Sequence, residues 1–533
     1  MTRARWPLVD AAQMRALDQY TIDILDIPGD VLMESAGRAV VDVLLALRRE
    51  GEPVCVICGG GNNGGDGFVI ARQLHQLGVP VKIALLADAE GLRGDAARNY
   101  ARAVAVGVPL EGSRWTAPHR GLLVDAVFGT GLSRPVAGVA ATSIRRMNAA
   151  RAAGHGDVRV VSVDLPSGLC ADTGRELGVA VSADATVTIG LPKLGLILEP
   201  GRALAGEISV ARIGIADATP DLTLTAQLLT RAGAGATLPT RLRSGHKGTF
   251  GHALLVAGSV GKTGAAALAA QGAARIGAGL VTLACPDSLN AVLEQKCTEA
   301  MTAPLPETAA HGLARDAEEG LLALAATRDA VGIGPGLGRD PETLELVRST
   351  VKRLEQPLVL DADALLAFAE EPALLASRQA PTILTPHPGE AAALLGGEAG
   401  DLNNDRPAAA RALARETGAI VVLKGASSVI AGPDESLWVN ATGGPLLATG
   451  GTGDVLLGMT VGLLAQGLSA DMAAPLAVFL HGAAADRLTA VRGDTGVLAS
   501  ELADSLPETL TSLRTALPPD ASDPRLVVSF PEP

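Results

Sequence analysis

The chain of 533 residues is poor in aromatic side chains and in positive charge. It contains three Trp, two Tyr and six Phe, and its formal net charge is −13. A protein that follows a nucleic-acid backbone needs a basic surface, and one that stacks on bases needs aromatic platforms. The composition therefore argues against nucleic acid as a partner.

The sequence also lacks a long uninterrupted apolar run. Residues 1–7 contain no apolar core of a signal peptide, and the most apolar late stretch, residues 455–470, is short and broken by glycine. A helix that spans a bilayer needs about 20 mostly apolar residues. We therefore expect a soluble cytoplasmic protein with no membrane partner.

Cysteine is scarce as well, with five in the whole chain. Cys55 and Cys58 fall within one apolar strand, where residues three apart face opposite sides of a sheet. We therefore expect buried free thiols in place of a redox or zinc pair.

Glycine, in contrast, is abundant, and two glycine-rich segments each contain one aspartate. Residues 59–67 read Gly-Gly-Gly-Asn-Asn-Gly-Gly-Asp-Gly, and residues 450–454 read Gly-Gly-Thr-Gly-Asp. Glycine lets the backbone approach an anion closely and point its N–H groups at it. Two phosphate-type sites so far apart in the sequence predict two active sites in one chain.

Apolar strand-like segments alternate with helical segments through both halves of the chain. This alternation predicts α/β domains with parallel sheets, helices on both faces and ligands at the carboxyl ends of the strands. The pattern weakens over residues 216–240, which are rich in small residues and proline. We predict a Rossmann-like domain over residues 1–225, a second α/β domain over residues 226–515 and a disordered tail over residues 516–533.

The first glycine-rich segment follows a strand and precedes a helical stretch expected to begin at residue 68. Residues 59–64 fit the dinucleotide fingerprint, and Asp88 lies about where a ribose-binding acid belongs, so an NAD-using dehydrogenase is one alternative. Two helical segments before the first strand argue against it. Asn62, Asn63 and Asp66 offer oxygen atoms that suit a cation as well as a ligand.

Further polar residues follow later strands of the same half. Asp125 and Asp164 end two strands, and each could cap a turn or face a ligand. Lys193 could stabilise a phosphate or lie in solvent.

The motifs Asn-Asn-x-Gly-Asp-Gly, Asp-Ala-x-x-Gly-Thr-Gly and Asp-x-Pro-Ser-Gly, in this order, resemble the epimerase domain of NAD(P)H-hydrate repair enzymes. The resemblance implies a K⁺ ion bound by Asn63, Asp125 and Ser167. Interconverting the two C6 epimers of a hydrated nicotinamide needs proton transfer, for which Asp164 is the candidate. The residues that the resemblance places on the hydrated dinucleotide are Asn62, Asn63, Gly64, Gly65, Asp66, Gly129, Thr130, Gly131, Leu132, Ser133, Arg134, Pro135 and Asp164.

The second half contains two candidate phosphate-binding motifs, of which the first is incomplete. Residues 257–263 suggest a P-loop, but Val256 stands where its first glycine must be. The segment that ends at Asp454 opens a long apolar helix, whose first N–H groups attract an anion. Asp454 would there take a proton from a hydroxyl that attacks a phosphate. The simpler alternative is an acid that stabilises the helix start.

Together with the glycine-rich residues 332–338, the Thr-Pro-His-Pro-Gly-Glu segment at 385–390 and Lys-Gly-Ala-Ser-Ser at 424–428, this segment resembles the ribokinase-like superfamily. More narrowly, it resembles ADP-dependent NAD(P)H-hydrate dehydratases. The resemblance implies a catalytic Asp454, and Mg²⁺ accompanying ADP. The residues implied to bind nucleotide are Lys424, Gly425, Ala426, Ser427, Ser428 and Gly453, and those implied to face the substrate are Ala278, Gly336, His387 and Asp454.

Both resemblances together cover residues 9–506 and imply a bifunctional repair enzyme that assembles as a homo-oligomer. One domain would interconvert the R and S hydrates of NADH and NADPH, and the other would dehydrate the S form while ADP becomes AMP and phosphate. Two alternatives remain open: a small-molecule kinase of the vitamin-precursor type fused to a nucleotide-binding regulatory domain, and a first half that only binds its ligand.

Overall fold

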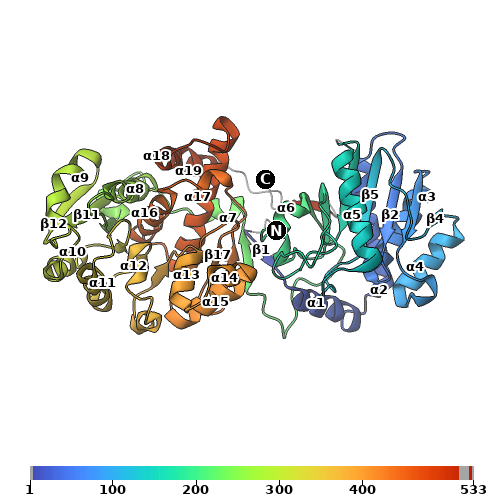
Figure 1. Cartoon of the computed structure of the whole chain (residues 1–533), viewed down its shortest axis with the longest axis horizontal. Helices are drawn as coiled ribbons and strands as arrows, with labels where there is room; N and C mark the ends of the chain where they lie inside the picture. The colour runs from blue at the N-terminus through green and yellow to red at the C-terminus, as the bar shows by residue number, and fades with distance from the viewer. Residues whose placement is uncertain (1–3, 155, 515–526, 531–533) are drawn as a thin grey trace. The chain divides into compact units, whose positions relative to one another are not determined.

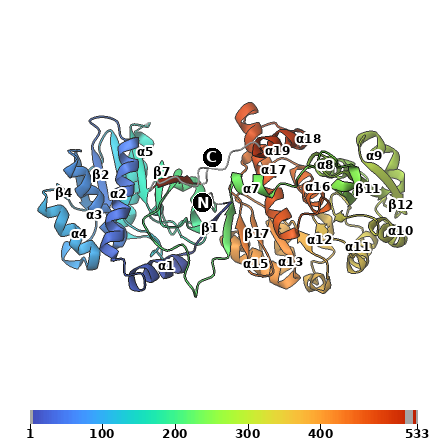
Figure 2. The same cartoon turned by 180° about the vertical axis from the view of Figure 1, so that it is seen from behind.

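The computed structural model describes residues 4–154, 156–514 and 527–530. Their contacts divide the chain into two compact units (Figure 1; Figure 2 from behind). One unit comprises residues 6–226 and 527–530, and the other comprises residues 4–5 and 227–514. β1 (Arg5–Leu8) lies where the chain passes from one unit to the other. The region in which the sequence pattern weakens, residues 216–240, contains ordered elements of its own, β9 (Ala226–Leu229) and α7 (Arg231–Thr237).

Within the described residues, the first unit has an eight-stranded sheet of order β19-β8-β7-β6-β5-β2-β3-β4. All neighbouring strands are parallel except β19 and β8. The strands are β2 (Val54–Cys58), β3 (Val81–Leu85), β4 (Leu110–Glu111), β5 (Gly121–Ala126), β6 (Val158–Val163), β7 (Ala185–Ile189), β8 (Glu207–Ala211) and β19 (Val527–Phe530). The helices are α1 (Ala11–Asp23), α2 (Gly29–Leu47), α3 (Asn62–Gln76), α4 (Gly94–Ala105), α5 (Gly138–Ala153) and α6 (Gly201–Ala205), with short 3₁₀ helices η1 (Ala89–Gly91) and η2 (Leu194–Leu196).

Helices cover both faces of this sheet, as the sequence predicts. Val56 and Cys58 of β2 pack in one core with residues of α2, α3 and α4. Cys55 and Ile57 face the other way, into a core that contains Ile144 of α5. The two thiols are therefore free, buried and on opposite faces, and burial raises the pKa of Cys55 to about 12.

Helix α3 begins at Asn62, six residues before the predicted start, so most of the glycine-rich segment is helical. The glycines allow this helix to lie directly against the preceding strand. A Cβ atom at Gly64 would lie 2.0 Å from the Gly59 carbonyl oxygen, and one at Gly67 would lie 2.7 Å from the Cys58 sulfur. Close packing, in addition to anion binding, therefore accounts for the glycines.

The prediction of a disordered tail from residue 516 is wrong for residues 527–530. These residues form β19, which pairs antiparallel with β8. Val528 and Phe530 are buried, and the Phe530 ring meets Trp6 edge-on at 5.5 Å between centroids. The proline-rich composition concealed this four-residue alternation of apolar side chains. Residues 516–526 and 531–533 lie outside the described part of the chain.

The second unit contains a sheet of order β9-β18-β17-β16-β15-β14-β13-β10-β11-β12. From β16 to β12 the neighbouring strands are parallel, whereas β17 pairs antiparallel with both β16 and β18. The remaining strands are β10 (His252–Val256), β11 (Leu280–Pro286), β12 (Met301–Leu305), β13 (Ala330–Ile333), β14 (Leu358–Leu360), β15 (Thr382–Leu384), β16 (Ile420–Leu423), β17 (Val429–Ala431) and β18 (Leu437–Val439).

The helices of the second unit are α8 (Thr263–Arg275), α9 (Asn290–Lys296), α10 (Glu318–Ala325), α11 (Pro341–Arg353), α12 (Asp363–Leu366), α13 (Pro388–Leu395), α14 (Ala399–Asn404), α15 (Arg406–Thr417), α16 (Thr452–Ala465), α17 (Ala470–Arg492), α18 (Ala499–Asp504) and α19 (Leu506–Arg514), with 3₁₀ helices η3 (Lys247–Phe250), η4 (Asp287–Leu289), η5 (Arg315–Ala317), η6 (Pro372–Ser377) and η7 (Pro445–Leu447). Among the described residues, no helix combines the length and apolarity that crossing a membrane requires.

Helix α16 forms the centre of the second unit's core. It is buried along almost its whole length and lies between α8 and α17 (Figure 1). A helix that is apolar on all sides belongs in an interior, and here it contacts β10, β13 and β14 as well. This packing fixes the helix start, where Asp454 lies.

Candidate active sites

The first unit contains a cavity of about 570 Å³ at the carboxyl ends of its parallel strands. Its lining includes the following residues that the sequence predicts to bind substrate: Asn62, Asn63, Asp66, Gly129, Thr130, Gly131, Leu132, Ser133, Arg134 and Asp164. Gly64, Gly65 and Pro135 lie outside this lining, as do Asp125 and Ser167, whose side chains are fully buried. The structure therefore gathers ten of the predicted residues around one space.

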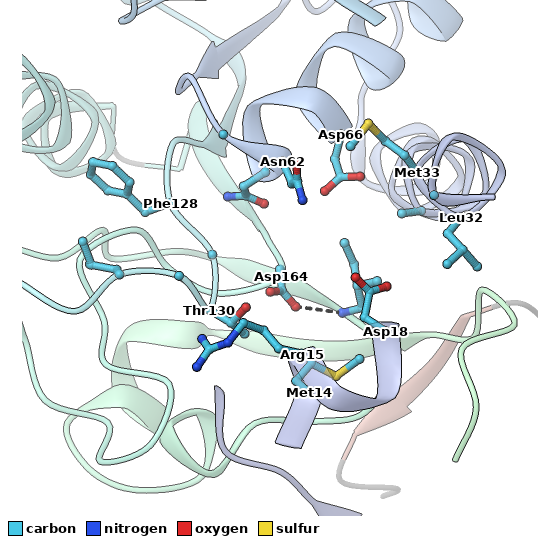
Figure 3. Close-up of a pocket in the computed structure, with 18 of the residues that line it drawn as sticks. Met14, Arg15, Asp18, Leu32, Met33, Asn62, Asp66, Phe128, Thr130 and Asp164 are labelled. Atoms are coloured by element: carbon cyan, nitrogen blue, oxygen red, sulfur yellow. Dashed lines mark hydrogen bonds between the residues drawn. The ribbon is translucent and has the colours of Figure 1, made fainter. Parts of the chain in front are cut away.

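Helices α1 and α2 also line this cavity, which sequence reasoning missed. Arg15 and Asp18 of α1 and Met33 of α2 belong to the lining, and Figure 3 shows Asp18 and Arg15 beside Asp164. The signal was available, because two helices precede the first strand. The polar residues of these helices recur at ordinary helical spacing, so the sequence alone does not show which of them face a site.

Asp164 and Lys193 form a buried ion pair beneath the cavity. Asp164 directly follows β6 with a positive φ of 69°, a backbone conformation rare outside glycine and typical of functional positions. One of its carboxylate oxygens, Oδ1, accepts hydrogen bonds from Lys193 Nζ at 2.5 Å, Ile189 N at 3.1 Å and Thr188 Oγ1 at 3.3 Å. Lys193 is 1% exposed and also donates to the Ile189 carbonyl at 2.7 Å. Lys193 is therefore not solvated, and it pairs with Asp164 at the cavity wall; a contact with a phosphate stays a prediction.

A second carboxyl group of the cavity has a very different environment. Asp66 is buried on α3, and its side chain points into the cavity (Figure 3). Burial raises the pKa of Asp66 well above its usual range, and the charges of Asp164 and Asp18 raise it further, against the effect of Lys193. Burial also raises the pKa of Asp18. The cavity thus holds Asp164, paired with Lys193, next to two carboxyl groups whose pKa values are raised.

The three residues predicted to bind K⁺ lie close to this pair. Asp125 Oδ2 accepts hydrogen bonds from Ser167 N at 2.8 Å and Ser162 Oγ at 2.9 Å, and burial raises its pKa. Both polar atoms of the Asn63 amide are buried without a hydrogen-bond partner in the described part of the chain. A Cβ atom at Gly129 would contact Asn63 Cγ at 3.7 Å and Asp164 Oδ2 at 3.2 Å. An unsatisfied buried amide beside a carboxylate is an incomplete polar site that a bound ligand or ion would complete.

In the second unit, Lys424, Gly453 and Asp454 lie together. Lys424 follows β16, and its Nζ lies 2.6 Å from Asp361 Oδ1. A Cβ atom at Gly453 would lie 3.6 Å from Lys424 Nζ and 3.9 Å from Asp361 Oδ2. Burial alone would lower the pKa of Lys424, but the charges of Asp361 and Glu390 outweigh it and the pKa is raised. The lysine is therefore part of a charge cluster and is not a solvated strand-end residue.

The start of α16 has the geometry of an anion cradle. Gly451 precedes the helix with a φ of 96°, and Asp454 lies in the first turn. Burial raises the pKa of Asp454 to about 6, Asp361 adds to the shift and Lys424 opposes it. Behind the cradle, buried His481 makes a 2.9 Å hydrogen bond through Nε2 to the Thr452 carbonyl, and burial lowers its pKa to about 4. The neutral imidazole can therefore donate to that carbonyl and hold the helix start in place.

The segment predicted to bind nucleotide is a short loop between β16 and β17. Arg406 of α15 donates to the carbonyl oxygens of Leu423, at 2.9 Å, and Ala426. Within the loop, Ser428 Oγ donates to the Gly425 carbonyl at 3.1 Å, and Ser427 has a positive φ of 52°. The loop conformation is thus fixed by one cation from a neighbouring helix.

His387 caps helix α13. Its Nδ1 accepts hydrogen bonds from Gly389 N at 3.0 Å and Glu390 N at 3.2 Å, and the Glu390 carboxylate accepts one from His387 N at 2.8 Å. Such a capping box satisfies several N–H groups at the helix start. The structure therefore gives His387 a role in its own turn, and its contact with substrate stays a prediction.

Two further residues are implied to face substrate, and they lie at opposite ends of α8. Gly336 lies near the start of this helix, whereas Ala278 follows its end. Ala278 precedes β11, at the edge where strands begin, while the other residues follow strand ends. A Cβ atom at Gly336 would lie 3.3 Å from Ala265 Cβ, so the alanine beside Gly336 is Ala265. The placement of Ala278 in this site is therefore wrong. In a segment so rich in alanine, one sequence cannot tell which alanine lies at the strand ends.

Two parallel α/β units, each with polar groups and a glycine-rich helix start at the carboxyl ends of its strands, define a two-site enzyme of the nucleotide-binding α/β class. Comparison with known families narrows this class. Residues 29–195 match the family described as YjeF-related protein N-terminus, and residues 253–508 match NAD(P)H-hydrate dehydratase.

Full-length relatives carry both regions in one chain. A bifunctional NAD(P)H-hydrate repair enzyme of Moorella thermoacetica is 44% identical over 527 residues, which cover 95% of this chain and 97% of that protein. The corresponding enzyme of Escherichia coli is 33% identical, covering 93% and 92%. The chain belongs to the family of bifunctional NAD(P)H-hydrate repair enzymes.

A solved structure resembles the second unit. The ADP/ATP-dependent NAD(P)H-hydrate dehydratase of Bacillus subtilis, co-crystallised with ATP and Mg²⁺, is 35% identical, and the match covers 54% of this chain and 98% of that one, with a TM-score of 0.46.

The buried ion pair of the first unit leads to a stability prediction. Lys193→Met should lower the free energy of unfolding of this unit by about 3–5 kcal/mol, because it leaves the Asp164 charge without its partner. The double variant with Asp164→Asn should recover part of that loss. Lys82→Met, which breaks a partly exposed pair with Glu111, is the matched control and should cost about 1 kcal/mol or less. Urea unfolding followed by tryptophan fluorescence measures these differences, and equal losses for the two lysine variants would contradict a buried, paired Lys193.

Proposed function

We propose that this chain repairs hydrated NADH and NADPH with two active sites. The cavity of the first unit would interconvert the R and S hydrates, and the site at the start of α16 would dehydrate the S form while ADP becomes AMP and phosphate. The observation that carries the proposal is a shared one. In each unit, a strand-end aspartate paired with a lysine lies beside a second aspartate with a raised pKa.

Epimerisation requires that the C6 hydroxyl leave and return on the other face of the ring. The C6–O bond breaks as the oxygen accepts a proton and departs as water, while the ring nitrogen's electron pair forms a C=N bond. Water then adds to the opposite face and loses a proton. One group must give a proton and another must take one, and each such transfer typically contributes 10²–10⁴-fold to a rate.

The two carboxyl groups of the cavity suit these two roles. Asp66, whose pKa is raised by burial, would donate the proton, whereas Asp164, paired with the Lys193 ammonium, would accept one. Pairs of titratable groups in contrasting environments commonly divide acid and base work in this way. Proton exchange with solvent would restore both groups between turnovers in the same direction.

We also propose that K⁺ binds beside this pair, held by Asn63, Asp125 and Ser167. The support is the unsatisfied Asn63 amide and the buried Asp125 carboxyl, whose oxygen atoms are the ligand type that alkali and alkaline-earth cations prefer. The ion would orient substrate and balance the local negative charge. Epimerisation should therefore fall in buffers without potassium and return when it is added. Full activity after exhaustive dialysis against a tetramethylammonium buffer would contradict the site.

In the second unit, the cradle formed by residues 450–454 would hold the phosphate of ADP, with Lys424 nearby. Asp454 would take the proton from the C6 hydroxyl as the β-phosphoryl group moves to its oxygen and AMP departs. Phosphate would then leave with the C6–O electron pair, and loss of the C5 proton would restore the ring double bond. Mg²⁺ would enter with ADP, since this ion usually binds through nucleotide phosphates and retained water.

The alternatives lose support for separate reasons. A dehydrogenase would need Asp88 at a ribose, but Asp88 is exposed and caps η1. A kinase fused to a regulatory domain would not be expected to resemble repair enzymes over 95% of the chain. Homo-oligomerisation and a cytoplasmic location stay predictions, and analytical ultracentrifugation tests the first.

The function is tested by incubating the chain with mixed hydrates and ADP while following dihydronicotinamide absorbance. The parent should convert both epimers, whereas Asp164→Asn should convert only the S form, with epimerisation reduced by roughly 10²–10⁴-fold. Asp88→Asn is the matched control, an aspartate after a strand of the same sheet, and should behave as the parent. An Asp164→Asn chain that still consumes the R form at the parental rate would remove Asp164 from the chemistry.

The second site is tested with Asp454→Asn. This variant should lose ADP-dependent dehydration by roughly 10²-fold or more, because its amide cannot take the proton. ADP affinity, measured by calorimetry, should change little, since the backbone cradle and Lys424 remain. Epimerisation should equal that of the parent. Loss of ADP binding would instead reassign Asp454 to holding the nucleotide or the fold.

A further inference from the structure

Asp361 is a buried carboxylate of the second site to which no sequence motif pointed. It directly follows β14 and is 1% exposed. Its N–H donates to the Ile333 carbonyl at 3.1 Å, and a Cβ atom at Gly334 would lie 1.8 Å from its carbonyl oxygen. The next residue, Ala362, has a positive φ of 51°. A position so closely fixed, next to a non-glycine residue in the left-handed region, is typical of a functional constraint.

The carboxylate of Asp361 contacts the groups that would perform the reaction. Oδ1 accepts a hydrogen bond from Lys424 Nζ at 2.6 Å. Oδ2 would lie 3.9 Å from a Cβ atom at Gly453, the residue before Asp454. Lys424 Nζ thus lies within 4.0 Å of two carboxylates, those of Asp361 and Glu390, and one ammonium cannot fully compensate both.

Other charged and titratable groups around Asp454 lie on separate elements. Glu390 of α13 lies 4.0 Å from Lys424 Nζ, and His481 of α17 is neutral and bound to the Thr452 carbonyl. Lys262 is engaged elsewhere, because it pairs with Asp363 at 2.8 Å. Asp361 is the group whose negative charge adds to burial in raising the pKa of Asp454, and Lys424 opposes that effect.

We propose that Asp361 is a positioning residue that holds the Lys424 ammonium against the anion cradle and places a negative charge at the start of α16, where Asp454 would accept the substrate proton. This inference rests on the proposed dehydration for the identity of the hydroxyl. The electrostatic coupling between Asp361 and Asp454 is independent of that reaction. A general base works best when its pKa lies near the working pH, and a carboxyl at its ordinary value is a weak base.

The sign of the effect follows from the charges. Asp454 has a raised pKa, so it becomes a base only as pH rises through about 6. Asp361→Asn removes a negative neighbour and should move this transition to lower pH by about one unit, a usual size for one nearby charge. Lys424→Met removes a positive neighbour and should move it to higher pH. A merely structural role of Asp361 would not produce opposite shifts.

The test uses the full chain labelled with ¹³C-aspartate, and Asp454→Asn assigns the carboxyl signal. The midpoint of the Asp454 titration is compared in the parent, Asp361→Asn, Lys424→Met and Asp363→Asn. Asp363 lies two residues away and pairs with Lys262, so Asp363→Asn should leave the midpoint unchanged. The acidic limb of the dehydration rate, at saturating ADP, should follow the NMR midpoint. Asp361→Glu, which keeps the negative charge, should give the parental Asp454 midpoint.

An unchanged Asp454 midpoint in Asp361→Asn would overturn the inference, as would equal shifts in Asp361→Asn and Asp363→Asn. If Asp361→Asn does not fold, the double variant Asp361→Asn/Lys424→Met, which leaves neither charge without its partner, decides in its place. An Asp454 midpoint below that of Lys424→Met supports the coupling, and an equal midpoint overturns it. If the parent does not turn over the hydrate although the titration shifts as expected, the proposed function fails and the coupling stands. The two failures are therefore distinguishable.

Discussion

Each half of this protein depends on one lysine–aspartate pair at the end of a parallel strand, which is buried in the first unit and partly exposed at its lysine in the second. Asp164 meets Lys193 at 2.5 Å in one unit, and Asp361 meets Lys424 at 2.6 Å in the other. A buried charge without a partner is costly, and removing one member of such a pair typically costs about 3–5 kcal/mol. The loops that carry these residues are therefore held at the sheet edge by a strong electrostatic constraint. The surrounding glycines, helix starts and caps are arranged around it.

The pairs also create the chemical asymmetry that catalysis needs. In each site the lysine compensates one aspartate, and a second aspartate nearby keeps a raised pKa: Asp66 in the first unit and Asp454 in the second. Burial without compensation disfavours the charged form of a carboxyl group, and a negative neighbour adds to that effect. The same device would supply a proton donor in one unit and a base of suitable strength in the other.

Much of this could be predicted from the sequence because strand-end residues of a parallel sheet meet at one edge. That rule located Asp125 and Asp164, the resemblance pointed to Lys424, and the second glycine-rich segment located the start of α16. The rule also applied to Asp361, which follows an apolar strand, but no glycine-rich motif drew attention to it. The partners could not be predicted, since Lys193 and Asp164 are 29 residues apart and Lys424 and Asp361 are 63 apart. The start of α3 at Asn62 could not be predicted either, because it depends on how the glycines pack against β2. The same holds for β19, because its strand forms only by pairing with β8, which is distant in the sequence.

If the proposed function holds, one chain carries two complete and independent active sites. The most direct test mixes two chains that each lack one site, Asp164→Asn and Asp454→Asn, and supplies the pure R hydrate with ADP. We expect that neither chain alone restores dihydronicotinamide absorbance at an appreciable rate. The mixture should restore it, because the S hydrate made by one chain diffuses to the other. A mixture as inactive as its components, with both variants folded and ADP bound, would contradict the proposed function.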